Sequence, residues 1–331
     1  MSIVIDVMGA LAPYFTQDAI ADMVSDLPPV ETPIKNLLYP EANQKQKNSP
    51  YIKVSDIIDT TGAPPVVRRG SRAYPVDGTS EENRLIEVQP IKLSSFLLGK
   101  EINDLIALGR TESIDAIVRE KIEYLRDETS KASEIMACQS LSGEISYPLA
   151  TGESIDSRYD IAFGTINTMP AANIASDDLG KLRVKLEAQL EAQRKTGASG
   201  DVRFLAADDV YTAISAMIFA AGANPPVVWT EYGFILFGRY KIMSMSNTFV
   251  LPGETASRPV IPAGYLQTVD LKKSGMLFYA SLDDMDANLA PLPFYAKPLK
   301  SDNPSGVTIL SESKPLCAPA VKKMVRRKVL N

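Results

Sequence analysis

Apolar residues recur at helical spacing over one long stretch of this chain, residues 113–142. Because residues three and four apart share one face of an α-helix, the spacing predicts an amphipathic helix. The helix would be about 45 Å long at a rise of ~1.5 Å per residue. Thr111 or Ser113 can cap its start and Gly143 can end it. The apolar positions are Ile114, Ile117, Val118, Ile122, Leu125, Ala132, Ile135 and Met136. The opposite side carries charges of both signs, which is typical of a solvated face with local ion pairs.

Later stretches mix helix and strand patterns. Residues 177–195 place leucines on one helical face and precede Gly197, which predicts a second helix. Residues 201–217 are typical of a strand that passes into a helix. Apolar runs predict further strands at 233–246, 258–270 and 274–284. Because helices and strands follow no strict βαβ alternation, the pattern predicts an α+β fold.

The first part of the chain predicts an arm and a projecting hairpin. Residues 1–50 hold several prolines and end in a polar run, which predicts an arm with little core of its own. Residues 51–58 and 84–93 alternate as strands do, and a Gly-, Pro- and Arg-rich stretch, 60–83, separates them. So long a loop in a compact domain is typical of a functional contact.

Three arginines, Arg68, Arg69 and Arg72, stand near the middle of this long loop. The loop contains too few apolar residues to form a hydrophobic core of its own. We therefore expect the three guanidinium groups to meet carboxylates of a neighbouring subunit.

The composition narrows the classes of function. The chain has 331 residues, 45% of them hydrophobic, so it can bury a sizeable core. It has no histidine, which removes Ser-His-Asp and Cys-His nucleophile activation and the commonest zinc sites. No glycine-rich phosphate-binding motif occurs. The net charge of −5 argues against a dedicated nucleic-acid binder, and the lack of a long apolar run predicts no contact with a membrane.

Candidate chemistry is sparse. The carboxylates that an enzyme could use are Asp208, Asp209, Asp283, Asp284 and Asp286. Adjacent carboxylates diverge on a strand and are usually solvated on a helix. We therefore assign no catalytic, cofactor-binding or metal-binding residue and expect no enzyme activity. Cys138 and Cys317 lie far apart in unlike contexts and are expected to be free thiols.

The C-terminal segment 321–330 carries the one concentrated basic run. Its members are Lys322, Lys323, Arg326, Arg327 and Lys328. Two interpretations stay open: salt-sensitive contacts with DNA phosphates, or a strand at a subunit boundary that pairs with acidic neighbours. The acidic balance of the whole chain favours the strand.

The order of these elements resembles the Hong Kong 97-type capsid fold, and four segments resemble the lambda-like major capsid protein family of tailed phages. The segments are VVRRGSR at 66–72, REKIEYLRDETSKASEIMACQSLSG at 119–143, RPVIPAGYLQTVD at 258–270 and SDNPSGVTILSESKPLCAP at 301–319. The resemblance covers nearly the whole chain after about Tyr51, whereas the first fifty residues match poorly. Asn303 departs from the family's Asp-Pro-Gly element.

The resemblance implies a division of the chain. The parts would be an N-terminal arm (1–50), an extended β-hairpin loop (51–98), a peripheral domain with a long spine helix (99–165), an axial domain (166–290) and return strands of the peripheral domain (291–331). The absence of a long helical segment before this fold favours a scaffolding protein that acts in trans.

The resemblance also implies a function. The chain would be a major capsid protein that assembles into hexamers and pentamers of an icosahedral shell around double-stranded DNA. Its partners would be other copies of itself, a scaffolding protein, the portal, a decoration or cement protein, and packaged DNA held by weak contacts. It would be part of the virion after assembly in the cytoplasm of the bacterial host.

Three alternatives stay open at this point. An encapsulin-like cargo nanocompartment shares the fold but would enclose an enzyme in place of DNA. A carboxylate-based enzyme would show an ordinary native mass and not that of a shell. A phage tail component would form tubes or small rings.

Overall fold

The computed structural model describes residues 22, 26, 27, 30–53, 85–107, 111–151, 154–197, 200–220, 227–230, 233–302 and 304–330. Its helices are α3 (Pro33–Leu38), α4 (Gly99–Ala107), α5 (Thr111–Ser140), α6 (Leu179–Lys195) and α7 (Asp208–Ala220), with short 3-10 helices η2 (Glu41–Asn43) and η5 (Val321–Lys323). Its strands are β1 (Gln44–Lys47), β2 (Tyr51–Lys53), β3 (Leu85–Glu87), β4 (Ile91–Leu98), β5 (Glu144–Thr151), β6 (Ser154–Ala162), β7 (Asn167–Met169), β8 (Val202–Ala206), β9 (Val227–Thr230), β10 (Phe234–Phe237), β11 (Tyr240–Ser244), β12 (Thr248–Val250), β13 (Ser257–Pro259), β14 (Tyr265–Asp270), β15 (Gly275–Ala280), β16 (Tyr295–Asp302), β17 (Ser305–Ser313), β18 (Pro315–Pro319) and β19 (Met324–Lys328).

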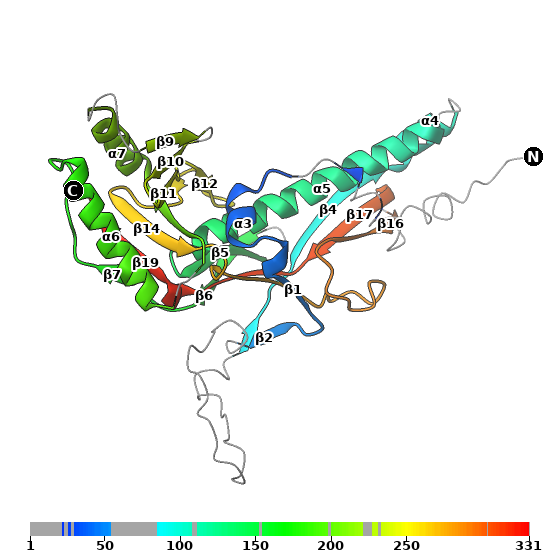
Figure 1. Ribbon diagram of the computed structural model, residues 1–331. Coiled ribbons are helices and arrows are strands. Elements are labelled where there is room, and N and C mark those ends of the chain that lie inside the picture. Colours follow the sequence, from blue (N-terminus) through cyan, green and yellow to red (C-terminus); the bar gives the residue numbers. More distant parts are fainter. Residues whose placement is uncertain are drawn as a thin grey trace, which may run out of the picture.

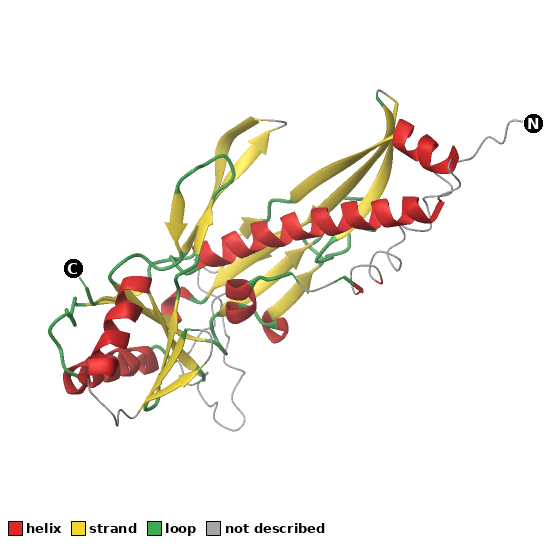
Figure 2. Ribbon diagram, turned by 90° about the horizontal axis from the view of Figure 1, so that it is seen from above, coloured by secondary structure: helices red, strands yellow, loops and turns green. Residues whose placement is uncertain are grey.

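The long helix α5 is the axis of one half of the molecule (Figure 1). A three-stranded antiparallel sheet in the order β16-β17-β4 runs alongside it (Figure 2). Val118, Ile122 and Leu125 of α5 are buried, as are Leu97 and Ile309 of the sheet. Helix and sheet therefore bury apolar side chains along their line of contact.

A seven-stranded mixed sheet forms the other half, in the order β7-β19-β14-β8-β11-β10-β9, with α6 and α7 beside it (Figure 1). Leu182 and Leu186 of α6 are buried. Two buried glutamines of the same helix face the sheet: Gln189 donates its side-chain amide to the carbonyl oxygen of Leu266 at 3.0 Å. Gln193 donates to the carbonyl oxygen of Lys323. The helix is thus held by apolar packing and by amide contacts that satisfy buried backbone oxygens.

Part of the predicted N-terminal arm packs into the core of the same chain. α3 lies against α5, and β1 adds in parallel to β15 in the sheet β1-β15-β18. Ile34, Leu38 and Tyr39 are buried. The phenol of Tyr39 donates to Ser140 Oγ at 2.8 Å, and Ser274 Oγ donates to the carbonyl oxygen of Leu38.

Glu134 of α5 anchors this segment electrostatically. Its two carboxylate oxygens accept hydrogen bonds from the backbone N–H groups of Ile34 and Lys35, each at 2.8 Å. These donors belong to the first turn of α3, whose N–H groups have no partner within the helix. Burial raises the pKa of Glu134, and the two N–H groups oppose that rise. The carboxylate thus acts as a remote cap for α3.

The predicted helices are confirmed. α5 corresponds to the stretch 113–142, α6 to 177–195, and β8 with α7 to 201–217. The N–H of Lys181 donates to the side chain of Asp178, the N-cap of α6, at 2.8 Å. Gly143 and Gly197, which follow the two helices, have φ values of 88° and 85°, a region that favours glycine. Within the described residues, no helix is long and apolar enough to span a membrane.

The prediction of one strand over residues 84–93 is wrong. β3 ends at Glu87 and pairs with β2, whereas β4 begins at Ile91 and pairs with β17. Pro90 lies between them and has no backbone N–H that could donate a hydrogen bond to a neighbouring strand. The break lets the chain leave the base of the hairpin and enter a different sheet.

We predict that Glu134→Ala loosens the segment that carries α3. It would remove two charge-assisted hydrogen bonds and lower the free energy of unfolding by roughly 1–2 kcal/mol. Urea denaturation and limited proteolysis near residues 30–47 would measure this. Glu128→Ala is the control, because the ion pair of Glu128 is with Lys131, at 2.7 Å in the same helix. Equal stability losses in the two variants would contradict the anchoring role.

Candidate assembly surfaces and the ion-pair network

The three arginines of the long loop, Arg68, Arg69 and Arg72, lie outside the described residues, so their contacts stay a prediction. The base of that loop is described. β2 and β3 pair antiparallel, with Ile52 opposite Ile86, and both side chains are buried in a cluster that includes Phe278 and Leu316. The two strands that carry the loop are therefore fixed to the core.

The other face of this strand pair is exposed. Tyr51 is 46% exposed and Leu85 is 54% exposed. Lys53 lies opposite Leu85 in the register, and Glu87 lies opposite Tyr51. This face, called here the β2–β3 face, therefore combines apolar surface with charge at the base of the loop.

The C-terminal basic run forms η5 and β19, which lies between β14 and β7 in the seven-stranded sheet. Arg326 donates to Gln267 Oε1 at 2.9 Å and to the carbonyl oxygen of Leu141 at 2.9 Å. Arg327 donates to the carbonyl oxygen of Pro170 at 3.0 Å. Both guanidinium groups thus have acceptors within the chain.

Burial affects the members of the run unequally. Desolvation lowers the pKa of Arg326, with Tyr265 opposing it, and desolvation also lowers the pKa of Arg327. Lys323 is buried, whereas Lys322 is exposed and Lys328 is half-buried. Contact of this run with a neighbour or with DNA stays a prediction, and Lys322 is its exposed member.

Of the candidate carboxylates, Asp208 and Asp209 begin α7. Asp209 Oδ2 accepts a hydrogen bond from the N–H of Gly264 at 2.8 Å. Gly264 has a φ of 77°, in the turn before β14. The carboxylate thus fastens this turn to the start of α7, which is a structural task.

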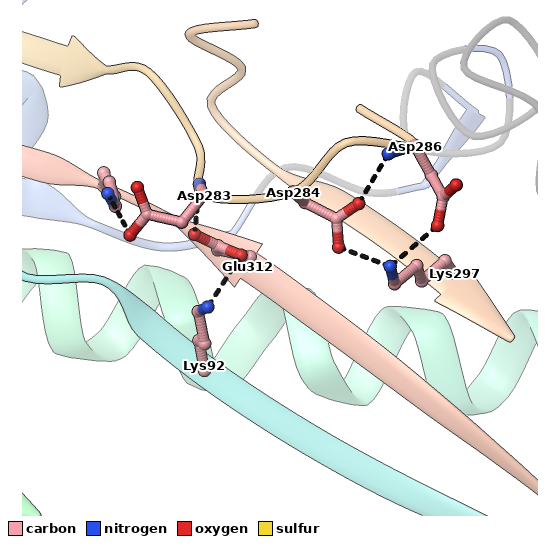
Figure 3. A network of polar contacts seen from close by, with 7 residues as sticks. Lys92, Asp283, Asp284, Asp286, Lys297 and Glu312 are labelled. Carbon is pink, nitrogen blue, oxygen red and sulfur yellow. Dashed lines mark hydrogen bonds and ion pairs between the residues drawn. The ribbon is translucent and has the colours of Figure 1, made fainter. Parts of the chain in front are cut away.

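The other three carboxylates enter an ion-pair network at the loop between β15 and β16. Lys297 Nζ lies 2.6 Å from Asp284 Oδ2 and 2.8 Å from Asp286 Oδ2 (Figure 3). Asp283 Oδ2 lies 2.6 Å from Nζ of Lys314, a side chain that is only 2% exposed. Each of the three aspartates therefore has a cationic partner.

Glu312 of β17 joins the network to the neighbouring strand. Its Oε1 accepts from the N–H of Asp283 at 3.0 Å, and its Oε2 lies 3.3 Å from Nζ of Lys92 in β4 (Figure 3). The contacts thus cross from the loop through β17 to β4. They fasten the loop to the end of the three-stranded sheet.

The charges in this network stabilise one another. The hydrogen bond to Asp284, followed by that to Asp286, raises the pKa of Lys297. Burial is the largest single effect on Asp284 and favours the neutral acid, but the hydrogen bond and charge of Lys297 together with the backbone N–H groups of Asp286 and Ala287 outweigh it and lower the pKa of that carboxyl. Asp284 is therefore ionised and Lys297 protonated at neutral pH. Within the described part of the chain, no group of three or more His, Cys, Asp or Glu side chains could hold a metal ion.

Cys138 and Cys317 are free and buried, as expected for two unpaired thiols. Burial is the main cause that raises the pKa of each to about 12. Since the thiolate is the reactive species, neither sulfur is activated for chemistry at neutral pH.

Sequence reasoning missed the network as a unit. It noted Asp283, Asp284 and Asp286 but not their partners Lys297 and Lys314, which follow 11 to 31 residues later along the chain. No local spacing rule joins such residues, because the contacts depend on the β16-β17 hairpin. The one hint in the sequence was the acidic run DDMD, which has no basic residue within it. Carboxylates in such a run need cationic partners if they become buried.

A long helix laid along a three-stranded sheet and a seven-stranded sheet with two helices are parts of the Hong Kong 97-type fold. The chain belongs to the family of phage major capsid protein E, whose model matches residues 16–329. It is therefore a capsid protein of the phage virion, with a structural and not an enzymatic role. No curated protein matches the sequence.

One solved structure shares the fold at low sequence identity, and two others are similar over most of the chain. A crystal structure assigned as the capsid protein of a prophage of E. coli CFT073 is 14% identical, with 97% of this chain and 98% of that chain covered and a TM-score of 0.60. A phage-related protein from Bordetella bronchiseptica RB50 is 11% identical, with coverage of 95% and 97% and a TM-score of 0.48. The capsid of cyanophage A-1(L) is 15% identical, with coverage of 93% and 95% and a TM-score of 0.46.

We predict that Lys297→Met destabilises the fold in a pH-dependent way. At pH 7 the loss should be roughly 1 kcal/mol, because the network is partly exposed. The folded-state pKa of Asp284 is below its unfolded value, so the contribution is present above the unfolded pKa and is lost as pH falls through the folded one. The difference from wild type should therefore shrink below about pH 4.

Urea denaturation over a pH series measures this difference. Lys300→Met is the matched control, because Lys300 lies on the same strand in an exposed pair with Asp302 at 3.6 Å. The control should match wild type at every pH. A loss for Lys297→Met that is the same at pH 7 and pH 3 would contradict the assignment.

Proposed function

We propose that copies of this chain assemble into hexameric and pentameric rings, and that these rings form a closed icosahedral shell around double-stranded DNA. The single observation that carries the proposal is the match of the capsid protein E family model over residues 16–329. The family match also favours a phage shell over an encapsulin-like cargo compartment, because the matching model describes a phage capsid protein.

The division of labour within a subunit follows the five parts expected from the sequence. The loop that starts at β2 and returns at β3 would reach over an adjacent subunit. The seven-stranded sheet with α6 and α7 would meet its copies around the centre of a ring, and α5 would brace the region between rings. Many modest interfaces of this kind allow errors to be reversed before the shell closes.

The partners are assigned on the same basis. A scaffolding protein in trans, a portal and a decoration or cement protein would complete the head, which assembles in the host cytoplasm. The net charge of −5 supports weak contacts with the packaged DNA. Where the basic run reaches a phosphate, the exposed Lys322 would make the contact.

The test is electron microscopy of the purified chain, expressed alone and with neighbouring phage genes. We expect spherical shells built of rings of six and five subunits, and shells from phage particles should protect DNA from nuclease. Tubes, small rings or a protein of ordinary native mass would contradict the proposal. Shells that contain an enzyme and no DNA would favour the encapsulin-like alternative.

We predict that the triple variant Arg68→Glu, Arg69→Glu and Arg72→Glu leaves the isolated subunit folded but abolishes shells. An exposed ion pair is worth only ~0.2–1 kcal/mol, yet the same loss recurs at every subunit contact. Circular dichroism and the thermal midpoint should be nearly unchanged, whereas electron micrographs at ordinary salt should lack shells. Lys272→Glu, at an exposed residue in the turn between β14 and β15, controls for added negative charge. Normal shells from the triple variant would contradict the loop's role.

A further inference from the structure

Three stretches that are far apart in the sequence meet at one end of the seven-stranded sheet. They are the end of α6, the turn between β14 and β15, and η5, which leads into β19 (Figure 1). Lys273 Nζ in the turn donates to the carbonyl oxygen of Gly197, just after α6, at 3.3 Å. The N–H of Ala320, just before η5, donates to the carbonyl oxygen of Ser274 at 2.8 Å, and Gln193 of α6 donates directly to η5. The three stretches are therefore fastened to one another.

Cations gather where these stretches meet. In residues 191–197, 270–274 and 320–324 the exposed charged residues are five cations and one carboxylate, Glu191. The cations, called here the basic corner, are Arg194, Lys195, Lys272, Lys273 and Lys322. The whole chain has more acidic than basic residues, 40 against 35, so the corner reverses the overall balance. Because the stretches touch, their charges reinforce one another within the Debye length of roughly 10 Å at about 0.1 M salt.

The subunit itself does not neutralise these charges. Within the described chain, the side chains of Lys195, Lys272 and Lys322 make no ion pair or hydrogen bond. Asp270 is buried and accepts hydrogen bonds from the backbone N–H groups of Gly200 at 2.9 Å and of Lys272 at 3.1 Å. This carboxylate therefore fixes the backbone of the turn and leaves the ammonium group of Lys272 free for a contact outside the subunit.

The basic corner lacks the apolar surface that a protein partner would need. Of the large apolar residues that are exposed in the described chain, none belongs to these three stretches. Protein–protein interfaces have an apolar core, whereas protein–DNA interfaces are more polar and much more positively charged. Lysine binds a phosphate as a point charge, and phosphate contacts carry no sequence information. The chemistry of the corner therefore fits the phosphate backbone of a nucleic acid of any sequence.

We propose that the basic corner contacts the phosphates of the packaged double-stranded DNA, so that this end of the seven-stranded sheet faces the interior of the shell. The inference rests on the proposed shell function and adds to it the surface that lines the interior. A few phosphate contacts in each subunit are weak, because salt cations compete for the same phosphates. They recur in every copy, however, and so they hold the outermost DNA without fixing its position.

The first test measures DNA binding by the unassembled subunit. A fluorescent DNA duplex is titrated over a salt series with wild type and with the triple variant Lys195→Gln, Lys272→Gln and Lys322→Gln. Each lost phosphate contact should lower the steepness of log affinity against log salt by about 0.9. The affinity of the triple variant at low salt should fall at least about tenfold.

The matched control removes the same number of charges elsewhere. It is the triple variant Lys53→Gln, Lys100→Gln and Lys300→Gln, at exposed lysines of β2, α4 and β16. The control should keep the affinity and the salt dependence of wild type, and both variants should keep its thermal midpoint, because surface changes of this kind alter stability little. Equal losses of affinity in the two variants, or a wild-type subunit that binds no duplex at low salt, would overturn the proposal.

The second test locates the corner in empty shells. Cys138 and Cys317 are buried, so the variant Lys272→Cys places a reactive thiol in a chain whose native thiols are protected. A small maleimide that enters the shell should label this thiol, whereas a maleimide polymer too large to enter should label it only in unassembled subunits.

Two results of this labelling contradict the inference while leaving the shell function intact. Labelling of intact shells by the polymer would put the corner on the outside, and protection from both reagents would put it in a contact between subunits. Failure of the wild-type chain to form shells would instead overturn the proposed function.

Discussion

The burial of α5 against strands from distant parts of the chain is the constraint on which the rest of the structure depends. The helix contacts β4 and β5, which are near it in sequence, and also β17 and β18, which come more than 160 residues after its end. The Sγ of Cys317 on β18 lies 3.7 Å from the carbonyl oxygen of Ser133 on α5. Because these contacts join distant parts of the chain, forming the core costs loop-closure entropy. This cost is offset only when β17 and β18 have packed against the helix.

Local patterns predicted the helices well, since each depends on its own residues. The spacing of leucines, the cap at Asp178 and Gly197 all lie within one stretch, and so the sequence predicts α6 closely. The packing of the N-terminal segment could not be found in this way. β1 has the polar sequence QKQK and forms by backbone pairing with β15 more than two hundred residues away. Such pairing leaves no trace in the side-chain pattern of the strand itself.

At the candidate site, too, the sequence predicted local features but not long-range contacts. The sequence identified which segments are charged, but charge alone does not distinguish a solvated side chain from a paired one. Arg326 looked like a candidate for external contact, yet its guanidinium also donates to the carbonyl of Leu141, 185 residues away. The acidic run at 283–286 resembled solvated charge, but Asp283 meets a lysine that is almost entirely buried. The fold supplies partners that no spacing rule contains.

The arrangement of β18 and β19 has a consequence for the folding of a newly synthesised chain. β18 completes the sheet that holds β1 and β15, and β19 stands between β14 and β7. A nascent chain still lacking these strands would leave α5 and the edges of two sheets uncovered, so it could not present the native surface of a subunit. The core of the subunit can therefore close only after β18 and β19 have been synthesised, which makes the order of translation part of the folding mechanism.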